Sequence, residues 1–429
     1  MKKAICMVAL GCFVSFLFAA ARAEPATPMV LSVGQVEKAP SLPADVVKMV
    51  QPAIQLVPAY QSRSDVFPST TPLPKTLTEL PDVVSALVGF WDNDIASLCE
   101  KNFIEPIDAV FEELGLDPKE ILPPDIYNAV AWQGKIWALP YRIETFVLKY
   151  QADTFKRVGV EPVFETWDEM LAVAEKLSRG AFPDTQISGF SPVKMPDDQF
   201  GSFLIGVAMD VPGDSAVNLS QLLSRYQERK VIVPDNFNWR DPVHDAGIRY
   251  ILSRALTVGR DVRIAPIPAT LMPGMPETIR PLGLMECFAV RKNTPEKTAA
   301  ARNFLKTILS KEGQLALVNA TALDKIQKDT LFRHVPVFRH VLDSAEFSEI
   351  AVRTPAYKTL AECCTNARFA PANKTVTGPV LEAILARTKE VTSYIRSTGD
   401  RSSGFFKLAE PLQVQAASKA AGSPDVSRY

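Results

Sequence analysis

The chain has 429 residues and a mass of 47.1 kDa, which exceeds a single average domain and suffices for two or three. Apolar residues make up 47% and charged residues 22%, and Gly and Pro are too few for low complexity, so a disordered or collagen-like protein is excluded. The net charge of −1 provides no basic field to attract a polyphosphate, and no nucleic-acid partner is expected.

The first 23 residues have the layout of a secretory signal peptide. A short basic start precedes an apolar run to Ala21, and Ala21–Ala23 places small residues at the −3 and −1 positions of a cleavage site. We therefore expect cleavage before Glu24 and a soluble mature protein in the periplasm. The run is just long enough to span a bilayer, so an uncleaved anchor is one alternative. Lipidation of Cys12, in a partial lipobox, is the other.

Four cysteines remain after cleavage: Cys99, Cys287, Cys363 and Cys364. In an oxidising compartment they allow up to two disulfides in three pairings. A bridge between the adjacent Cys363 and Cys364 would be strained. We therefore expect bonds to Cys99 or Cys287, or free buried thiols. The absence of a CxxC motif removes the usual redox and zinc spacings.

The first elements read as alternating strands and helices. Met29–Gly34 and Ile54–Tyr60 are rich in Val, Ile and Leu and predict strands, and Ala44–Val50 predicts a helix between them. A third strand is expected at 80–84. The loop Trp91–Asp94 then leads into a helix that ends near residue 103.

Two further strands are predicted at Gly134–Pro140 and Phe146–Tyr150, on either side of a Tyr-Arg-Ile-Glu crossing. Thr166 and Glu169 form a capping box that starts a helix, and Gly180 suits its C-terminal end.

Two more helices are expected towards the C-terminus. One begins at Thr294–Pro295, with Pro in the first turn, and the other covers about 379–396. Residues 181–280 are interrupted by prolines and weakly periodic. The alternation of strands and helices predicts an α/β protein with largely parallel sheets, and the length favours two lobes.

Catalytic and cofactor motifs are absent from the sequence. We expect structural roles for the three histidines, His244, His334 and His340, whose spacings fit no zinc motif. The signatures of serine hydrolases, P-loop NTPases and dinucleotide-binding enzymes are missing. The carboxylate pairs Asp92/Asp94 and Asp197/Asp198 have residue types that a glycosidase uses, but sequence does not give their separation. No enzyme activity, cofactor or metal site is expected.

Several short segments resemble one known family in their order and spacing. These segments are Pro81–Val84, Asn102–Asp108, Gly134–Tyr141, Lys149–Gly159, Thr166–Glu169, Ala265–Pro268, Ala289–Asn293, Phe304–Lys306 and Ser310–Gln314. The set is similar to family 1 extracellular solute-binding proteins, the maltose-binding-protein-like substrate-binding components of ABC importers. Each segment is weak alone, and the ordered set is specific.

The resemblance implies an α/β fold of the two-lobed periplasmic binding protein type (type II), with a ligand cleft between the lobes and closure by hinge bending. It also implies a monomer, a small-molecule ligand and ABC permease subunits in the inner membrane as partners. The expected division is 1–23 signal peptide, 24–143 N-lobe, 144–283 C-lobe, 284–335 N-lobe return, 336–405 C-lobe helices and 406–429 loosely ordered tail.

The resemblance also points to ligand-contacting residues in the N-lobe and at the crossing. Trp91, Asp92 and Asp94 occupy a loop where the family places sugar contacts, and a helix N-cap role for either carboxylate is the alternative. Glu144 matches a ligand-contacting Glu at the first lobe crossing, with a structural hinge carboxylate as the alternative. Tyr141, like the neighbouring Arg142, contacts ligand or packs in the hinge.

In the C-lobe, Trp239 is either a stacking platform or an ordinary loop aromatic. Arg368 and Phe369 match a segment that lines the family's cleft. Ser253–Arg260 only approximates the family's Gly-rich stretch, and the segment before it is shortened, so the C-lobe contacts and the ligand are expected to differ.

The expected function is therefore capture of a small hydroxyl-rich ligand, a sugar or a polyol, for an ABC importer. None of the nine tyrosines adjoins another, which disfavours ferric iron. A polyamine ligand remains open, because Asp92, Asp94 and Glu144 supply carboxylates. A secreted polysaccharide-active enzyme and a sensing protein without a transporter are the alternatives from other classes.

Overall fold

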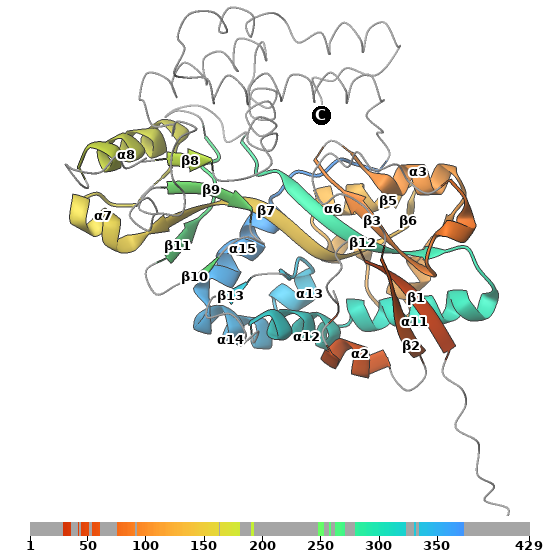
Figure 1. The fold of residues 1–429 in the computed structure, drawn as a ribbon. Coiled ribbons are helices and arrows are strands. Elements are labelled where there is room, and N and C mark those ends of the chain that lie inside the picture. The colour runs from red at the N-terminus through yellow and green to blue at the C-terminus, as the bar shows by residue number, and fades with distance from the viewer. Residues whose placement is uncertain are drawn as a thin grey trace, which may run out of the picture.

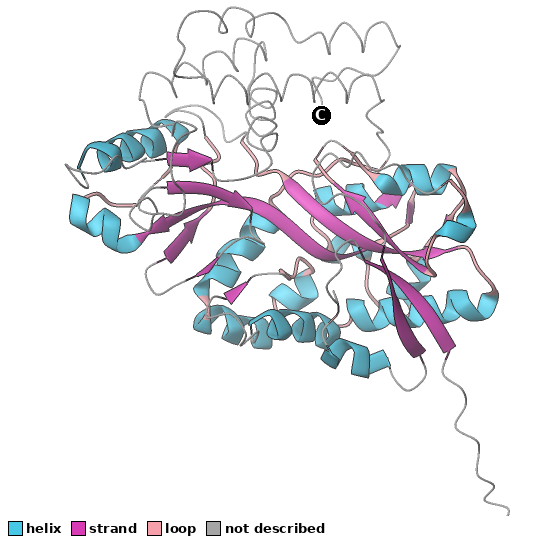
Figure 2. Ribbon diagram, viewed as in Figure 1, coloured by secondary structure: helices cyan, strands magenta, loops and turns pink. Residues whose placement is uncertain are grey.

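The computed structural model describes residues 29–35, 42, 44–50, 54–60, 75–90, 92–162, 164–180, 190–192, 248–252, 257–258, 262–270, 279–322, 330–331 and 334–372. These residues form a curved sheet with helices packed on both sides (Figures 1 and 2). The described strands are β1 (Met29–Gln35), β2 (Ile54–Tyr60), β3 (Val83–Val88), β4 (Ile104–Glu105), β5 (Ala131–Trp132), β6 (Lys135–Ile136), β7 (Leu139–Gln151), β8 (Phe190–Pro192), β9 (Ile248–Leu252), β10 (Thr257–Val258), β11 (Val262–Ala265), β12 (Gly283–Arg291) and β13 (Thr330–Leu331).

The described helices are α2 (Ala44–Val50), α3 (Asp94–Glu100), α4 (Asp108–Glu112), α5 (Pro118–Ile121), α6 (Pro124–Val130), α7 (Ala152–Val158), α8 (Trp167–Gly180), α11 (Pro295–Leu309), α12 (Lys311–Ala322), α13 (Arg339–Leu342), α14 (Ala345–Arg353) and α15 (Pro355–Thr365). The predicted opening of strand, helix and strand is confirmed by β1, α2 and β2, and β1 pairs in parallel with both β2 and β3. The third strand starts three residues later than predicted, at Val83.

The main sheet is mixed, so the expectation of largely parallel sheets was wrong. Its strand order is β2-β1-β3-β12-β7-β9-β8, with β11 on β7 and β4 on β12. Strand β12 is antiparallel to both β3 and β7, and β7 is antiparallel to β9 and β11. The cause is that β12 enters the middle of the sheet from a distant part of the chain, where no short helical crossover fixes a parallel direction.

Strand β7 joins the two halves of the sheet. Its first part, Leu139–Thr145, pairs with β12, and its second part, Phe146–Gln151, pairs with β9 and β11. Two strands around a crossing were predicted here, and that prediction was wrong. The polar crossing residues stay in one 13-residue strand because their charges are paired within the sheet. The predicted lobe boundary at 143/144 falls inside β7, and the lobe limits remain predictions.

The predicted helix starts at Thr166 and at Thr294–Pro295 are confirmed. At α8, the Thr166 hydroxyl accepts the amide of Glu169 at 3.2 Å, and the Glu169 carboxylate accepts the amide of Thr166 at 3.1 Å. This is the reciprocal capping box. At α11, the Thr294 hydroxyl accepts the amide of Lys297 at 3.4 Å, and Pro295 opens the first turn. The signal peptide, the helix at 379–396 and the tail lie outside the described residues.

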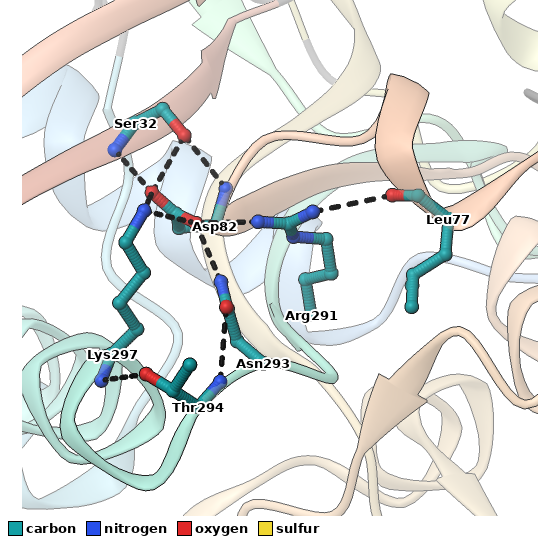
Figure 3. Close-up of polar contacts among 7 residues, drawn as sticks. All are labelled: Ser32, Leu77, Asp82, Arg291, Asn293, Thr294 and Lys297. Atoms are coloured by element: carbon teal, nitrogen blue, oxygen red, sulfur yellow. Dashed lines mark hydrogen bonds and ion pairs between the residues drawn. The ribbon is translucent and has the colours of Figure 1, made fainter.

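Asp82, at the entrance to β3, ties three elements together (Figure 3). Its carboxylate accepts from the amide and hydroxyl of Ser32 on β1, at 2.9 and 2.8 Å. It also accepts from Arg291 at the end of β12 at 2.7 Å, from Asn293 at 2.6 Å and from Lys297 on α11 at 3.1 Å. Only 3% of Asp82 is exposed, so this one carboxylate fastens β1, β3 and the start of α11.

Cys99, Cys287, Cys363 and Cys364 are buried and free, which confirms the thiol alternative over the disulfides. Burial raises the pKa of Cys99 and of Cys363 to about 12, so both stay protonated at neutral pH. Within the part of the chain that the structure describes, no helix is both long and apolar enough to cross a membrane.

Candidate ligand-binding site

The register of the sheet places four polar side chains on one face where β3, β12 and β7 run side by side. Glu286 on β12 lies opposite Arg142 on β7, and Glu144 is two residues along the same strand. Ser85 on β3 is two residues from Leu87, which also pairs with Glu286. Because side chains alternate along a strand, Ser85, Arg142, Glu144 and Glu286 share one face. We call these four residues the crossing cluster.

The crossing cluster is buried and internally paired. The Arg142 guanidinium lies 2.8 Å from Oε1 of Glu144 and 3.8 Å from Oε2 of Glu286, and the Ser85 hydroxyl donates to Oε1 of Glu286. Glu144 is 4% exposed and Glu286 6% exposed. Buried charges require such partners, because an unpaired one costs several kcal/mol.

The acidity of Glu286 is perturbed by its burial. Burial raises its pKa above the ordinary value for Glu, and the charge of Glu144 acts in the same direction. Arg142 and the hydroxyls of Ser85 and Tyr141 oppose this without cancelling it.

Tyr141 packs beside this cluster at an irregularity in β7. The strand pairing skips from Arg142 to Pro140, which leaves Tyr141 in a β-bulge, a feature that re-aims a side chain. Its ring stacks on Phe288 with centroids 3.7 Å apart and is 3% exposed. This geometry favours the hinge-packing interpretation of Tyr141.

The loop after β3 is fastened to the segment that contains Arg368 and Phe369. The Asn93 amide donates to the carbonyl oxygens of Ala129 and Ala370, both at 2.8 Å, and the Ala370 amide donates to Gly89 at 2.8 Å. Asn93 also caps α3, through Ile95. The N-cap role considered for Asp92 or Asp94 therefore belongs to Asn93.

The two predicted carboxylates of this loop differ in exposure. Asp92 is half-buried, whereas Asp94 is buried as the first residue of α3 and its Oδ2 accepts the amide of Leu87 at 2.8 Å. This hydrogen bond engages one carboxylate oxygen of Asp94 and stabilises the turn after β3.

Arg368 and Phe369 lie against the start of β12. The backbone of Arg368 accepts from Gly283 at 2.9 Å and donates to Pro281 at 2.8 Å. The Phe369 ring occupies the space where a side chain on Gly283 would stand. Because Gly283 pairs with Thr145, this segment lies beside the crossing next to Glu144. Burial and backbone pairing thus bring Arg368, Phe369 and Glu144 to one region.

Two predicted residues, Trp91 and Trp239, and one predicted histidine, His244, lie outside the described residues. His334 is buried, near Gln314, and burial lowers its pKa to about 3, with a further contribution from Arg142. Sequence reasoning missed Glu286, although its signal was present as the single charge in the apolar run Gly283–Val290. The described residues contain no group of three His, Cys, Asp or Glu side chains arranged to hold a metal ion.

A separate pocket of about 430 Å³ lies along α11, away from the crossing cluster. Its lining consists of Glu105, Glu113, Asn293, Pro295, Thr298, Ala299, Arg302, Asn303 and Lys306. The charges pair across it, with Arg302 3.5 Å from Glu105 and Lys306 2.5 Å from Glu113.

The described fold is that of two-lobed solute-binding proteins. A maltose-bound Thermotoga protein, T. maritima MalE3, is 17% identical, with a TM-score of 0.58 over 90% of this chain and 99% of its own. The cyclic alpha-maltosyl-1,6-maltose binding protein of Arthrobacter globiformis is 14% identical, with a TM-score of 0.63 over 92% and 100%. UgpB of Mycobacterium tuberculosis, in complex with glycerophosphocholine, is 12% identical, with a TM-score of 0.60 over 91% and 98%.

The sequence itself matches a family as well. Residues 64–231 match the model of the bacterial extracellular solute-binding protein family. The resemblance inferred from the sequence segments is thus confirmed, and so is the expected two-lobed α/β fold. Proteins of this family bind solutes outside the cytoplasm.

Proposed function

We propose that this protein captures a small, uncharged, hydroxyl-rich ligand, a sugar or a polyol, between its lobes in the periplasm. It performs no chemistry on the ligand. Closure about the crossing strands presents the liganded form to the permease of an ABC importer, and the protein acts as a monomer.

One observation carries this proposal: a buried carboxylate, Glu144, stands at the point where β7 passes from one half of the sheet to the other. A carboxylate accepts several hydrogen bonds and so suits vicinal hydroxyl groups. The Arg368–Phe369 segment lies beside it through Gly283 and is fastened to the loop after β3. Ligand contacts from three parts of the chain would thus converge there.

The similar structures support the class of ligand. They include proteins solved with maltose and with cycloalternan, which are uncharged and carry several hydroxyl groups. Aromatic faces stack on sugar rings, and we assign that role to Trp91 and Trp239. Asp92 is the further hydroxyl acceptor, since it is half-buried, while Asp94, Arg368 and Phe369 shape the wall of the site.

A thermal-shift screen of the mature protein tests the proposal with maltose, cycloalternan and sorbitol. We expect a saturable rise in melting temperature with at least one of them, because a ligand that binds only the folded state stabilises it. Glu144→Gln should abolish that rise, measured against its own unliganded protein. Glu112→Gln, at an exposed site on α4, should retain it.

Two results would contradict the proposal. If no probe shifts the melting temperature, the hydroxyl-rich ligand class is excluded. If breakdown products accumulate from an oligosaccharide, the protein is a polysaccharide-active enzyme. Uptake of the labelled probe by cells that lack the gene separates transport from sensing: unchanged uptake would contradict delivery to an importer.

A further inference from the structure

Arg142 is the positive charge placed between the two carboxylates of the crossing cluster. It is 2.8 Å from Glu144 and 3.8 Å from Glu286, and its side chain is only 14% exposed. Charges at such distances in a poorly hydrated place interact strongly, because little water screens them. The electrostatic character of Glu144 is therefore set largely by Arg142.

The strand register explains why Arg142 holds this position. Arg142 and Glu144 lie two residues apart on one face of β7, and Glu286 lies directly opposite Arg142 on the antiparallel partner strand. Opposite charges at cross-strand positions stabilise a sheet. Ser85 holds Glu286 from the third strand. The guanidinium is thus fixed by the sheet and not by a loop.

Among the described residues, the titratable groups near the two carboxylates include Cys364, Tyr141 and His334, and Arg368 belongs to the segment beside Glu144. Cys364 of α15 lies near Glu144, and burial raises its pKa well above the ordinary value, so it stays neutral. Tyr141 hydrogen-bonds to Glu286. His334, which is near Arg142, is neutral at ordinary pH because burial lowers its pKa.

We propose that Arg142 is the residue that determines the charge selectivity of the ligand site: by neutralising Glu144, it leaves an acceptor for hydroxyl groups that does not attract a cation. This inference rests on the proposed ligand contact of Glu144. Such a site favours an uncharged polyhydroxyl ligand over a polyamine, because a polyamine would require an uncompensated carboxylate at the same place. Arg142 acts through Glu144 and is a positioning residue.

The experiment measures spermidine binding by isothermal titration calorimetry at low salt to four full-length mature proteins. They are the wild type, Arg142→Met, Arg142→Lys, and the double variant Arg142→Met/Glu144→Gln. We expect Arg142→Met to bind spermidine at least about tenfold more tightly than the wild type, because the substitution removes the positive charge that lies 2.8 Å from Glu144. Arg142→Lys keeps the positive charge and should bind spermidine as weakly as the wild type.

The double variant distinguishes charge selectivity from a structural effect. Arg142→Met/Glu144→Gln should lose the gain in spermidine binding, since it lacks the Glu144 carboxylate at the crossing. Loss of packing alone would not make the gain depend on that carboxylate.

The inference is overturned if Arg142→Met folds and binds spermidine no more tightly than the wild type, or if the double variant keeps the gain. Circular dichroism checks folding, and Arg142→Gln replaces Arg142→Met if the latter does not fold. The spermidine measurements need no sugar. If every hydroxyl-rich probe fails to bind the wild type, the proposed function falls, and these measurements still decide the role of Arg142.

Discussion

Replacing Asp82 with Asn should destabilise the protein more than any change at an exposed carboxylate. The variant keeps the shape of the side chain, but it removes the charge that Arg291 and Lys297 approach, and its amide group turns N–H donors towards the donors of Ser32 and Asn293. Asp82 is 3% exposed, so water does not replace the lost bonds.

The size of the expected loss of stability in Asp82→Asn follows from these contacts. Breaking a buried pair by neutralising one partner costs about 3–5 kcal/mol. The Lys297 side chain is 37% exposed and adds little, whereas Arg291, at 17%, and Ser32 lose bonds that are partly sheltered from water. We expect Asp82→Asn to lower the free energy of unfolding by about 3–5 kcal/mol at pH 7.

Urea denaturation followed by circular dichroism measures this loss. Asp45→Asn is the matched control, because Asp45 pairs with Lys48 at 3.1 Å with both side chains more than 70% exposed, and its loss should stay within about 0.5 kcal/mol. A loss below about 1 kcal/mol for Asp82→Asn, with an unchanged slope against urea, would refute the reasoning.

The pH dependence gives a second readout for Asp82. Burial alone would raise its pKa, but the bonds from the Ser32 amide, Arg291, the Ser32 hydroxyl and Lys297 outweigh burial and hold the pKa well below the ordinary value. A group whose pKa is lowered on folding stabilises the fold above its unfolded pKa, about 3.9. That stabilisation is lost as the pH falls below this value, so the difference between wild type and Asp82→Asn should narrow in acid.

Three further outcomes are expected. Asn93→Ala removes a helix cap and two hydrogen bonds of 2.8 Å. Urea denaturation should therefore show that the free energy of unfolding falls by about 2–3 kcal/mol. A loss below about 1 kcal/mol would contradict the role of Asn93. Gly283→Ala should cost about 1–3 kcal/mol and weaken ligand binding, because its Cβ meets the Phe369 ring; unchanged stability and affinity would contradict this packing. Burial lowers the pKa of His334 to about 3, so the free energy of unfolding of the wild type should fall as the pH drops from about 6.5 towards 3. His334→Gln should flatten that part of the plot of stability against pH. An unchanged plot would contradict this role of His334.

Local signals in the sequence predicted much of the fold. The capping box at Thr166 and the Thr294–Pro295 start were read correctly, because a helix N-terminus is decided by residues three or four positions apart. The direction of β12 was not predictable in this way. It depends on pairing with β3 and β7, which are distant in the chain.

The candidate site was only partly accessible to sequence reasoning. Glu144 stood out through the family resemblance, but the second carboxylate of the cluster, Glu286, is 142 positions further along the chain and meets Arg142 only through the antiparallel register. Asn93 looked like an ordinary loop residue between two aspartates, and only the structure shows its bonds to Ala370. Side chains that serve contacts across the fold leave little local pattern.

A crystal structure of the mature protein with the hydroxyl-rich probe that gives the largest thermal shift tests the central claim most directly. We predict that the ligand lies between the lobes, with a hydroxyl group within hydrogen-bond distance of Glu144 and with Arg142 still paired to that carboxylate. A ligand bound elsewhere, for example in the pocket along α11, with Glu144 untouched, would contradict it.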